Sequence, residues 1–269
     1  MRLPSNNFLA AALLAALCAA PAQAETPEGT SPEQKGLTIA KEAERRGDGY
    51  GDSSSTMQMI LRNRQGEESK REIRSRTLEV SGDGDKSLIV FDQPKDVRGT
   101  ALLTFTHKQA DDDRWLYLPA LKRVKRIAST NKSGPFMGSE FAFEDLGSQE
   151  IEKYTYKWIR DDKLEGQDAF VFERYPVDKS SGYTRQVVWM DQAEYRPLKL
   201  EFYDRKQSLL KTLTLLEYQK YLDKYWRPHR LEMVNHQTGK STTLKFKDFK
   251  FRNGFRDRDF DQASLQAAR

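Results

Sequence analysis

The feature that most constrains the fold is an alternation of apolar and polar side chains, which recurs between residues 53 and 251. Within one such stretch, Leu198 and Leu200 fall on one face of an extended strand and Lys199 falls on the other. Short breaks rich in Gly, Asp, Asn or Pro, such as 237–239, separate the stretches. Many short strands joined by hairpin-length turns predict one large antiparallel sheet, either curled or closed.

The same pattern predicts where the individual elements lie. A helix is expected from Ser31, which can act as N-cap before Pro32, with Gln34 completing a capping box, and it should end near Arg46. Other helical content is expected only in part of 139–147 and after residue 255. The strands are expected at 57–61, 73–80, 88–91, 101–106, 115–118, 154–159, 169–175, 183–190, 198–203, 209–216, 229–234 and 242–251.

The sheet is predicted to have one apolar face, and few helices are available to cover it. Two explanations fit: the sheet closes and fills its own interior, or it stays partly open around an apolar cavity. A membrane-spanning barrel is disfavoured because Arg74, Arg76, Glu173 and Arg185 interrupt the candidate strands with charge.

The N-terminal segment has the features of an export signal. Its apolar run, residues 8–20, is shorter than the ~20 residues that span a bilayer. Ala22 and Ala24 form a cleavage signal, so a secretory signal peptide is expected over 1–24, with a retained membrane anchor as the alternative. The mature chain would then be periplasmic, with a flexible linker over 25–35 and one domain over 36–269.

The charge and cysteine content narrow the partners. The formal net charge is +5 and would fall to +4 if Arg2 left with the signal peptide, because residues 1–24 hold no acid. Both signs of charge are interspersed, which argues against nucleic acid and is compatible with weak attraction to a membrane surface. Cys18 is the only cysteine and lies in the predicted signal peptide, so no disulfide or cysteine metal site is expected.

No familiar catalytic arrangement is present in the sequence. His107, His229 and His236 do not form a metal-binding motif, and no G-x-S-x-G motif presents a serine. Three aspartates at 111–113 lack the glycine and distal glutamate of a calcium loop and are interpreted as a turn. We therefore expect no catalytic residue, no metal and no cofactor.

The middle of the chain is unusual because aromatic residues alternate first with basic and then with acidic ones. Trp115 and Leu118 lie in a strand that is apolar on both faces. Phe136 and Met137 follow in a Ser/Gly/Pro loop, where they either fill the core as a plug or form a mobile apolar lip at the mouth of a cavity.

These blocks, RWLYLPALKRVKRI (114–127) and GPFMGSEFAFEDL (134–146), resemble the hallmark of the outer-membrane lipoprotein-sorting protein family, relatives of the periplasmic lipoprotein carrier LolA. FDQPKDVRGTALLTF (91–105) is similar to that family as well, and the resemblance spans roughly 36–254. Glu140 stands where an aspartate is usual, and Phe143 where a tyrosine is common. The resemblance implies an incomplete, or half, β-barrel: one strongly curved antiparallel sheet with a few short helices covering its concave face.

The resemblance also implies a carrier rather than an enzyme: acyl chains of a lipoprotein or lipid occupy the cavity, and an inner-membrane exporter is a partner. The alternatives are a non-catalytic adaptor with a filled interior, docked on an exporter, and a lipid hydrolase, for which no polar triad is apparent. We hypothesise that six residues line or gate the cavity, namely Trp115, Leu118, Phe136, Met137, Phe141 and Phe143.

The charged residues in this part of the chain are predicted to act in recognition. Arg123 and Arg126 are expected to face anionic headgroups, a partner, or the Glu144–Asp145 pair. In the last case they would form an ion-paired clasp whose opening admits cargo. The acidic pair could instead serve acid/base chemistry or cap a helix, and the capping role is favoured.

Overall fold

A computed structural model describes residues 30–267, and the chain from Ser31 onward forms one compact unit. The predicted signal peptide (1–24) and residues 25–29 of the predicted linker lie outside the described residues. Within residues 30–267, no helix is both long enough and apolar enough to span a membrane.

Two α-helices and thirteen strands make up the described part of the chain. The helices are α1 (Pro32–Gly47) and α2 (Gln262–Ala267). The strands are β1 (Asp52–Arg62), β2 (Glu68–Leu78), β3 (Lys86–Gln93), β4 (Ala101–Phe105), β5 (Asp113–Leu118), β6 (Arg123–Arg126), β7 (Tyr154–Leu164), β8 (Gln167–Pro176), β9 (Tyr183–Asp191), β10 (Pro197–Asp204), β11 (Leu209–Tyr221), β12 (Tyr225–Asn235) and β13 (Ser241–Phe251).

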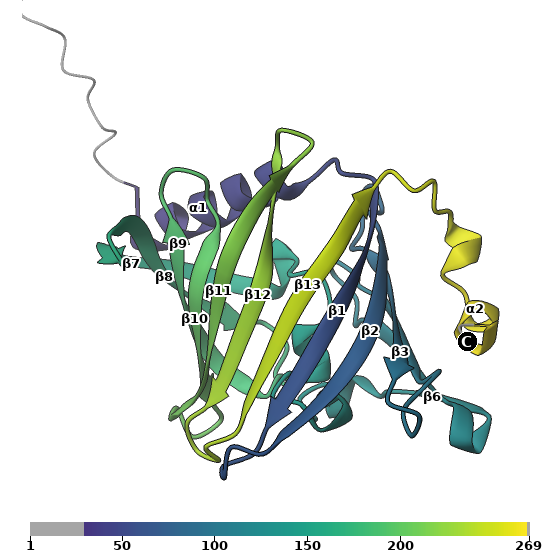
Figure 1. Cartoon of the computed structure of the whole chain (residues 1–269). Coiled ribbons are helices and arrows are strands. Elements are labelled where there is room, and N and C mark those ends of the chain that lie inside the picture. Colours follow the sequence, from purple (N-terminus) through teal and green to yellow (C-terminus); the bar gives the residue numbers. More distant parts are fainter. Residues whose placement is uncertain (1–29, 268–269) are drawn as a thin grey trace, which may run out of the picture. The chain divides into compact units, whose positions relative to one another are not determined.

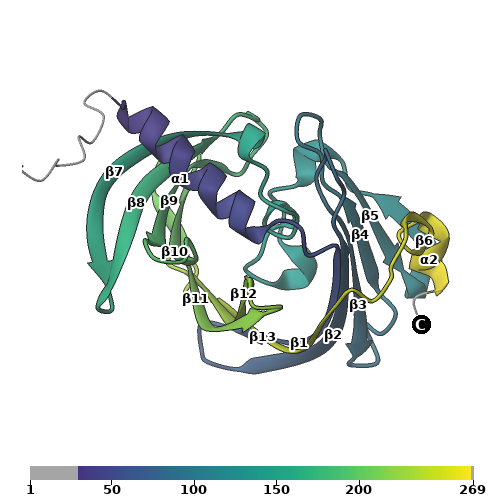
Figure 2. The same ribbon diagram turned by 90° about the horizontal axis from the view of Figure 1, so that it is seen from above.

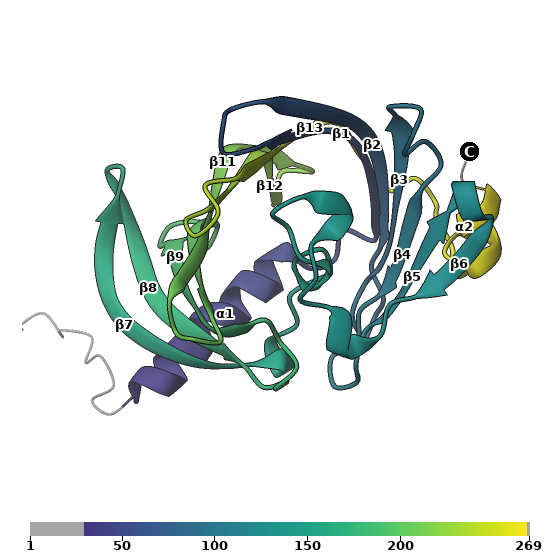
Figure 3. The same cartoon turned by 90° about the horizontal axis from the view of Figure 1, so that it is seen from below.

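All thirteen strands belong to one sheet in the order β6-β5-β4-β3-β2-β1-β13-β12-β11-β10-β9-β8-β7 (Figure 1). Every pairing is antiparallel. The order ends at β6 and β7, so the sheet curls without closing, as Figures 2 and 3 show from above and below. The predicted half-barrel is confirmed. The short strand β6 was missed, because its sequence, RVKR, carries more charge than apolar pattern.

The concave face carries the main core. Met59, Phe91, Leu102, Phe202 and Met233 come from strands far apart in the sequence and pack into one buried cluster. Residues 127–153, which connect β6 to β7 and are called the middle segment below, lie inside the curl (Figure 3). This segment contributes its own aromatic side chains to the cluster. It contains only short 3₁₀ turns, so the helix expected in part of 139–147 is a single turn, Phe143–Asp145.

A second, smaller core lies on the outer face of β3, β4 and β5. Leu88, Val90 and Leu103 point to this face and are covered by Phe260 and Leu265 from the C-terminal tail (Figure 2). The sheet is therefore apolar on both faces in this region, and α2 buries the outer one.

Helix α1 crosses the concave side and contacts β7 and β12 (Figure 2). The Ser31 hydroxyl accepts a hydrogen bond from the Gln34 N–H, which is the expected N-cap. Residues 32–35 therefore belong to the helix, and the linker predicted over 25–35 cannot extend that far. The buried side of the helix includes Gly36 and Ile39.

Gly36 sets how closely α1 approaches β7. A Cβ atom at Gly36 would lie 2.8 Å from the backbone nitrogen of Trp158 and 3.0 Å from that of Lys157. At Gly47, in the last turn of the same helix, an added Cβ would meet nothing within 4 Å. The two glycines therefore share a helix but differ in the space around them.

We predict that Gly36→Ala lowers the free energy of unfolding by about 1–3 kcal/mol, because the new methyl group meets backbone atoms that cannot rotate away. The control, Gly47→Ala, should be neutral or stabilising by up to about 1 kcal/mol, as expected for alanine in a helix. Urea unfolding followed by circular dichroism measures both. Equal effects at the two sites would contradict close packing at Gly36.

Candidate functional site

A cavity of about 1140 Å³ opens between α1, the middle segment and strands β8 to β12. This exceeds the ~300–1,000 Å³ usual for pockets that hold drug-sized ligands. Its floor is formed by apolar side chains of the concave face, among them Phe172, Val188, Met190, Leu200, Phe202, Leu213, Leu215 and Leu231. The interior of the half-barrel is therefore open on this side, and on the side of β1 to β5 the middle segment fills it.

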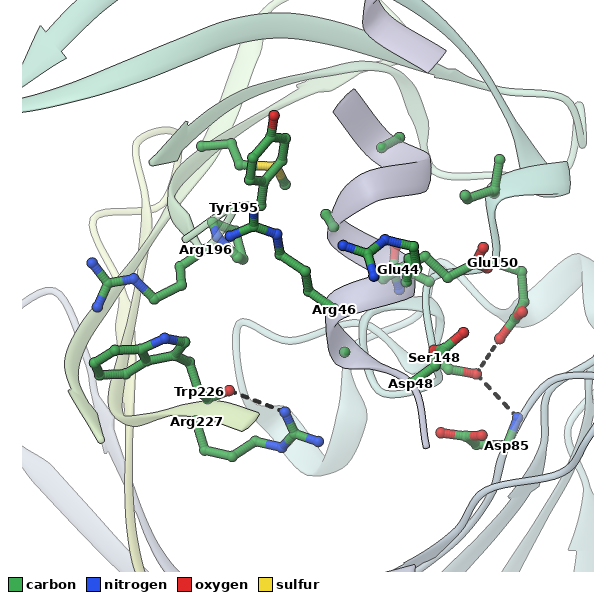
Figure 4. Close-up of a pocket in the computed structure, with 18 of the residues that line it drawn as sticks. Glu44, Arg46, Asp48, Asp85, Ser148, Glu150, Tyr195, Arg196, Trp226 and Arg227 are labelled. Atoms are coloured by element: carbon green, nitrogen blue, oxygen red, sulfur yellow. Dashed lines mark hydrogen bonds between the residues drawn. The ribbon is translucent and has the colours of Figure 1, made fainter. Parts of the chain in front are cut away.

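The mouth of the cavity is charged, and the two signs are unevenly distributed. Acidic side chains predominate where α1 ends and where the β2–β3 connection and the middle segment meet. They include Glu44, Asp48, Asp85 and Glu150 (Figure 4), and Glu79 also lines the cavity. Basic side chains predominate on the β10 to β12 side; they include Arg196, Lys220, Lys224 and Arg227.

On the acidic side, a serine links the carboxylate of Glu150 to the backbone of Asp85. The Asp85 N–H donates to Ser148 Oγ at 3.3 Å, and that hydroxyl donates to Glu150 Oε1 at 2.5 Å (Figure 4). Tyr50 donates its hydroxyl to Asp85 at 2.7 Å. Burial, together with the negative charges of Glu150 and Glu79, raises the pKa of Asp85 to about 6. Among residues 30–267, neither Asp85 nor Glu150 has a basic partner in an ion pair, although Glu150 is only 6% exposed.

On the basic side, Arg227 also lacks an ion-pair partner within the described residues. Its Nη1 donates a hydrogen bond to the carbonyl of Trp226 at 3.0 Å. The guanidinium lies 5.0 Å from the ring of Tyr50 and 5.6 Å from that of Phe251, in cation–π range. Burial lowers the pKa of Arg227.

The neighbouring Trp226 has an unused donor. Its indole Nε1 is buried and has no hydrogen-bond partner. Arg196 and Lys220 lie over the ring at 4.5 and 5.5 Å. Arg196 is itself held by Asp191 at 2.6 Å, so of these two arginines Arg227 has more unused donors.

One further acidic group has the spacing of a cation site. Carboxylate oxygens of Glu44, Glu150 and Glu152 lie within 4.8 Å of one another. Glu44 already faces Lys108 at 3.9 Å, and Glu152 is exposed. The expected absence of a metal stays a prediction.

Of the six residues assigned to a cavity or gate, the structure places only Phe141 on the cavity wall. Leu118, Phe136, Met137 and Phe143 pack in or against the main core instead. Phe136 is fully buried, with ring centroids 5.6 Å from both Phe91 and Phe143. Of the two interpretations of this loop, the position of Phe136 agrees with the plug, because its side chain fills the core and is not an exposed lip.

Trp115 needs a larger correction, because it lies on the opposite face of the sheet. It packs against the outer cluster, 5.1 Å from the ring of Phe105. Side chains alternate along a strand, so Leu116 and Leu118 point to the concave face while Trp115 points away from it. Because residues 115–118 are all apolar or aromatic, the sequence alone could not show which of these side chains face the concave side.

The proposed clasp has different partners from those expected. Arg126 is exposed and pairs with Asp113, and Arg123 is exposed. Asp145 pairs instead with Lys211 of β11 at 2.7 Å, with both side chains at least nine-tenths buried. Asp145 also accepts from the Ala142 N–H at 2.7 Å, which is the capping role, and from the Tyr183 hydroxyl at 2.9 Å.

Glu144 is anchored to the loop before β9. It accepts from the Ser181 hydroxyl at 2.8 Å and from the Gly182 N–H at 2.9 Å, and burial raises its pKa. The acidic pair therefore fixes the middle segment to β9 and β11.

We predict that Lys211→Met lowers the free energy of unfolding by about 3–5 kcal/mol, because it leaves the carboxylate of Asp145 buried without its cation. The matched control Arg126→Met removes an exposed pair and should cost less than about 1 kcal/mol. Urea denaturation of both variants at neutral pH gives the comparison. A loss of similar size in both would show that the Lys211–Asp145 pair does not anchor the segment.

The residues that sequence reasoning missed are Trp226 and Arg227 on the basic wall and Tyr50, Asp85 and Glu150 on the acidic one. A signal was present in KYWRPHR (224–230), where aromatic and basic residues alternate as they do in 114–127. The acidic wall had none, because its members come from three separate segments.

Comparison with known proteins agrees with this architecture. A family model described as an uncharacterized protein matches residues 83–267. A solved structure from Vibrio parahaemolyticus, provisionally named an outer membrane lipoprotein-sorting protein domain, is 61% identical with a TM-score of 0.86, over 87% of this chain and 99% of that one. No curated protein matches the chain.

Two more distant structures share the fold. A DUF1329 family protein from Desulfovibrio piger is 29% identical, with a TM-score of 0.83 over 88% of this chain and all of that one. A LolA superfamily protein from Nitrosomonas europaea is 21% identical, with a TM-score of 0.69 over 85% of this chain and 98% of that one. The fold is thus that of the LolA-like half-barrels. The chain belongs to the outer-membrane lipoprotein-sorting protein family, as its sequence blocks predicted.

Proposed function

We propose that the protein is a periplasmic carrier that binds the acyl chains of a lipoprotein or lipid in its cavity and carries this cargo toward the outer membrane. The observation that supports this most strongly is the open cavity of about 1140 Å³ with an apolar floor on the concave face. Each buried CH₂ contributes ~0.8 kcal/mol, so ten methylene groups would contribute on the order of 8 kcal/mol without a covalent bond.

The sequence and the family support the rest of the proposal. An export signal over 1–24 fits a periplasmic location, and membership in a lipoprotein-sorting family fits a carrier without catalysis. The donor in this proposal is an inner-membrane exporter, and the slight basic excess favours transient contact with a membrane surface. The adaptor alternative requires a filled interior, which the cavity does not favour.

The carrier function is tested at two positions of β12. Leu231 lines the cavity, where it lies opposite Leu215 of β11. Val234 lies three residues further along the same strand, is 43% exposed and is not part of the cavity wall. The same substitution at both positions therefore separates an effect on the cavity from a general effect on the strand.

We predict that Leu231→Asp lowers the retention of a diacyl lipid at least tenfold, because the acyl chain would have to desolvate a carboxylate. Val234→Asp should retain lipid as the unsubstituted chain does. The chain from Glu25 is incubated with vesicles and separated from them by gel filtration, and bound lipid is measured by mass spectrometry. Unchanged retention in Leu231→Asp would argue that this cavity is not the acyl site.

A further inference from the structure

The mouth of the cavity holds groups of opposite charge on facing walls. Arg227 projects from the β12 wall, and Asp85 and Glu150 project from the opposite one (Figure 4). Tyr50 lies between them, with its hydroxyl on Asp85 and its ring beside the Arg227 guanidinium. No ion pair joins the two walls among residues 30–267 for any of these three charged groups.

Charged groups taken out of water are costly unless they are paired. Glu150 is 6% exposed with one hydroxyl as its side-chain hydrogen-bond donor, and Arg227 uses one of its five N–H donors on a backbone carbonyl. The basic wall therefore has unused donors for an anion, and the acidic wall has unused acceptors for a cation.

A ligand that carries both charges a short distance apart would satisfy both walls at once. A phosphate matches the planar fork of an arginine. A primary ammonium offers three donors to carboxylates. Phosphoethanolamine carries both of these groups on one short headgroup.

We propose that the mouth of the cavity binds the phosphoethanolamine headgroup of a diacyl phospholipid, with the phosphate on Arg227 and the ammonium on Asp85 and Glu150. This inference rests on the proposed carrier function, because the acyl chains of the same lipid occupy the apolar floor. The headgroup site differs from the one expected at Arg123 and Arg126. These two arginines are the first and last residues of the edge strand β6, and neither lines the cavity.

The test compares four lipids with identical acyl chains on the chain from Glu25: phosphatidylethanolamine, phosphatidylcholine, phosphatidylglycerol and diacylglycerol. Each is offered in vesicles of an otherwise constant composition, and bound lipid is quantified by native mass spectrometry. Phosphatidylethanolamine should be retained about tenfold more than phosphatidylcholine, whose quaternary ammonium donates no hydrogen bond, and than phosphatidylglycerol, which has no cation. Diacylglycerol should bind through its chains alone, and least well.

Three variants test which wall of the cavity binds the phosphate and which binds the ammonium. Arg227→Gln should lower all three phospholipids to the level of diacylglycerol, because each of them carries the phosphate. The double variant Asp85→Asn with Glu150→Gln should remove only the preference for phosphatidylethanolamine. Arg126→Gln, an arginine outside the cavity lining, should change nothing. Thermal unfolding verifies that each variant is folded, and the comparison of the four lipids on the unsubstituted chain stands without any variant.

The outcomes separate the two levels of the proposal. Equal retention of all four lipids would overturn the headgroup site while leaving the carrier function intact. Tightest binding of phosphatidylglycerol would also overturn it, in favour of a purely anionic headgroup. Failure to retain any of the four, diacylglycerol included, would overturn the carrier function itself.

Discussion

The structure depends on one constraint: a broad antiparallel sheet with an apolar concave face has very little helix to cover it. A sheet of thirteen strands that does not close must bury that face by other means. Helix α1 covers one part, and the segment between β6 and β7 fills another with Phe136, Phe141 and Phe143. The face that remains is the floor of the cavity. The proposed binding site is thus the part of the concave face that neither α1 nor the middle segment covers. Apolar side chains of this face belong to the core cluster and also line the cavity that would hold the acyl chains.

Two local contacts determine how the cover is placed. Gly36 lets α1 lie directly against the backbone of β7, since a side chain there would meet Trp158. The buried pair of Asp145 and Lys211 ties the middle segment to β11, 66 residues further along the chain. The first contact fixes the helix on β7, and the second fixes a segment whose only helical parts are short 3₁₀ turns.

Much of the fold was predictable, because a two-residue period survives in each strand regardless of its neighbours. The N-cap signal of α1 also depends only on neighbouring residues. The strand period and the cap therefore both predicted elements that the structure contains. Trp115 was placed on the wrong face because its strand is apolar on both sides, and the covering helix α2 begins only at Gln262. The partner of Asp145 and the facing walls of Arg227 and Asp85 are set by strand order, which no local pattern encodes. Of the residues predicted to line or gate a cavity, Phe141 lies on the cavity wall, and the others pack in the cores of the two faces.

Carriage of an acylated molecule is tested most directly by native mass spectrometry of the chain exported to the periplasm and purified without detergent. The structure predicts a mass above that of the polypeptide from Glu25, with the excess released by organic solvent as an acylated species. A clean polypeptide mass, together with no uptake of added phospholipid or lipopeptide, would contradict the carrier function and favour an adaptor that docks on an exporter.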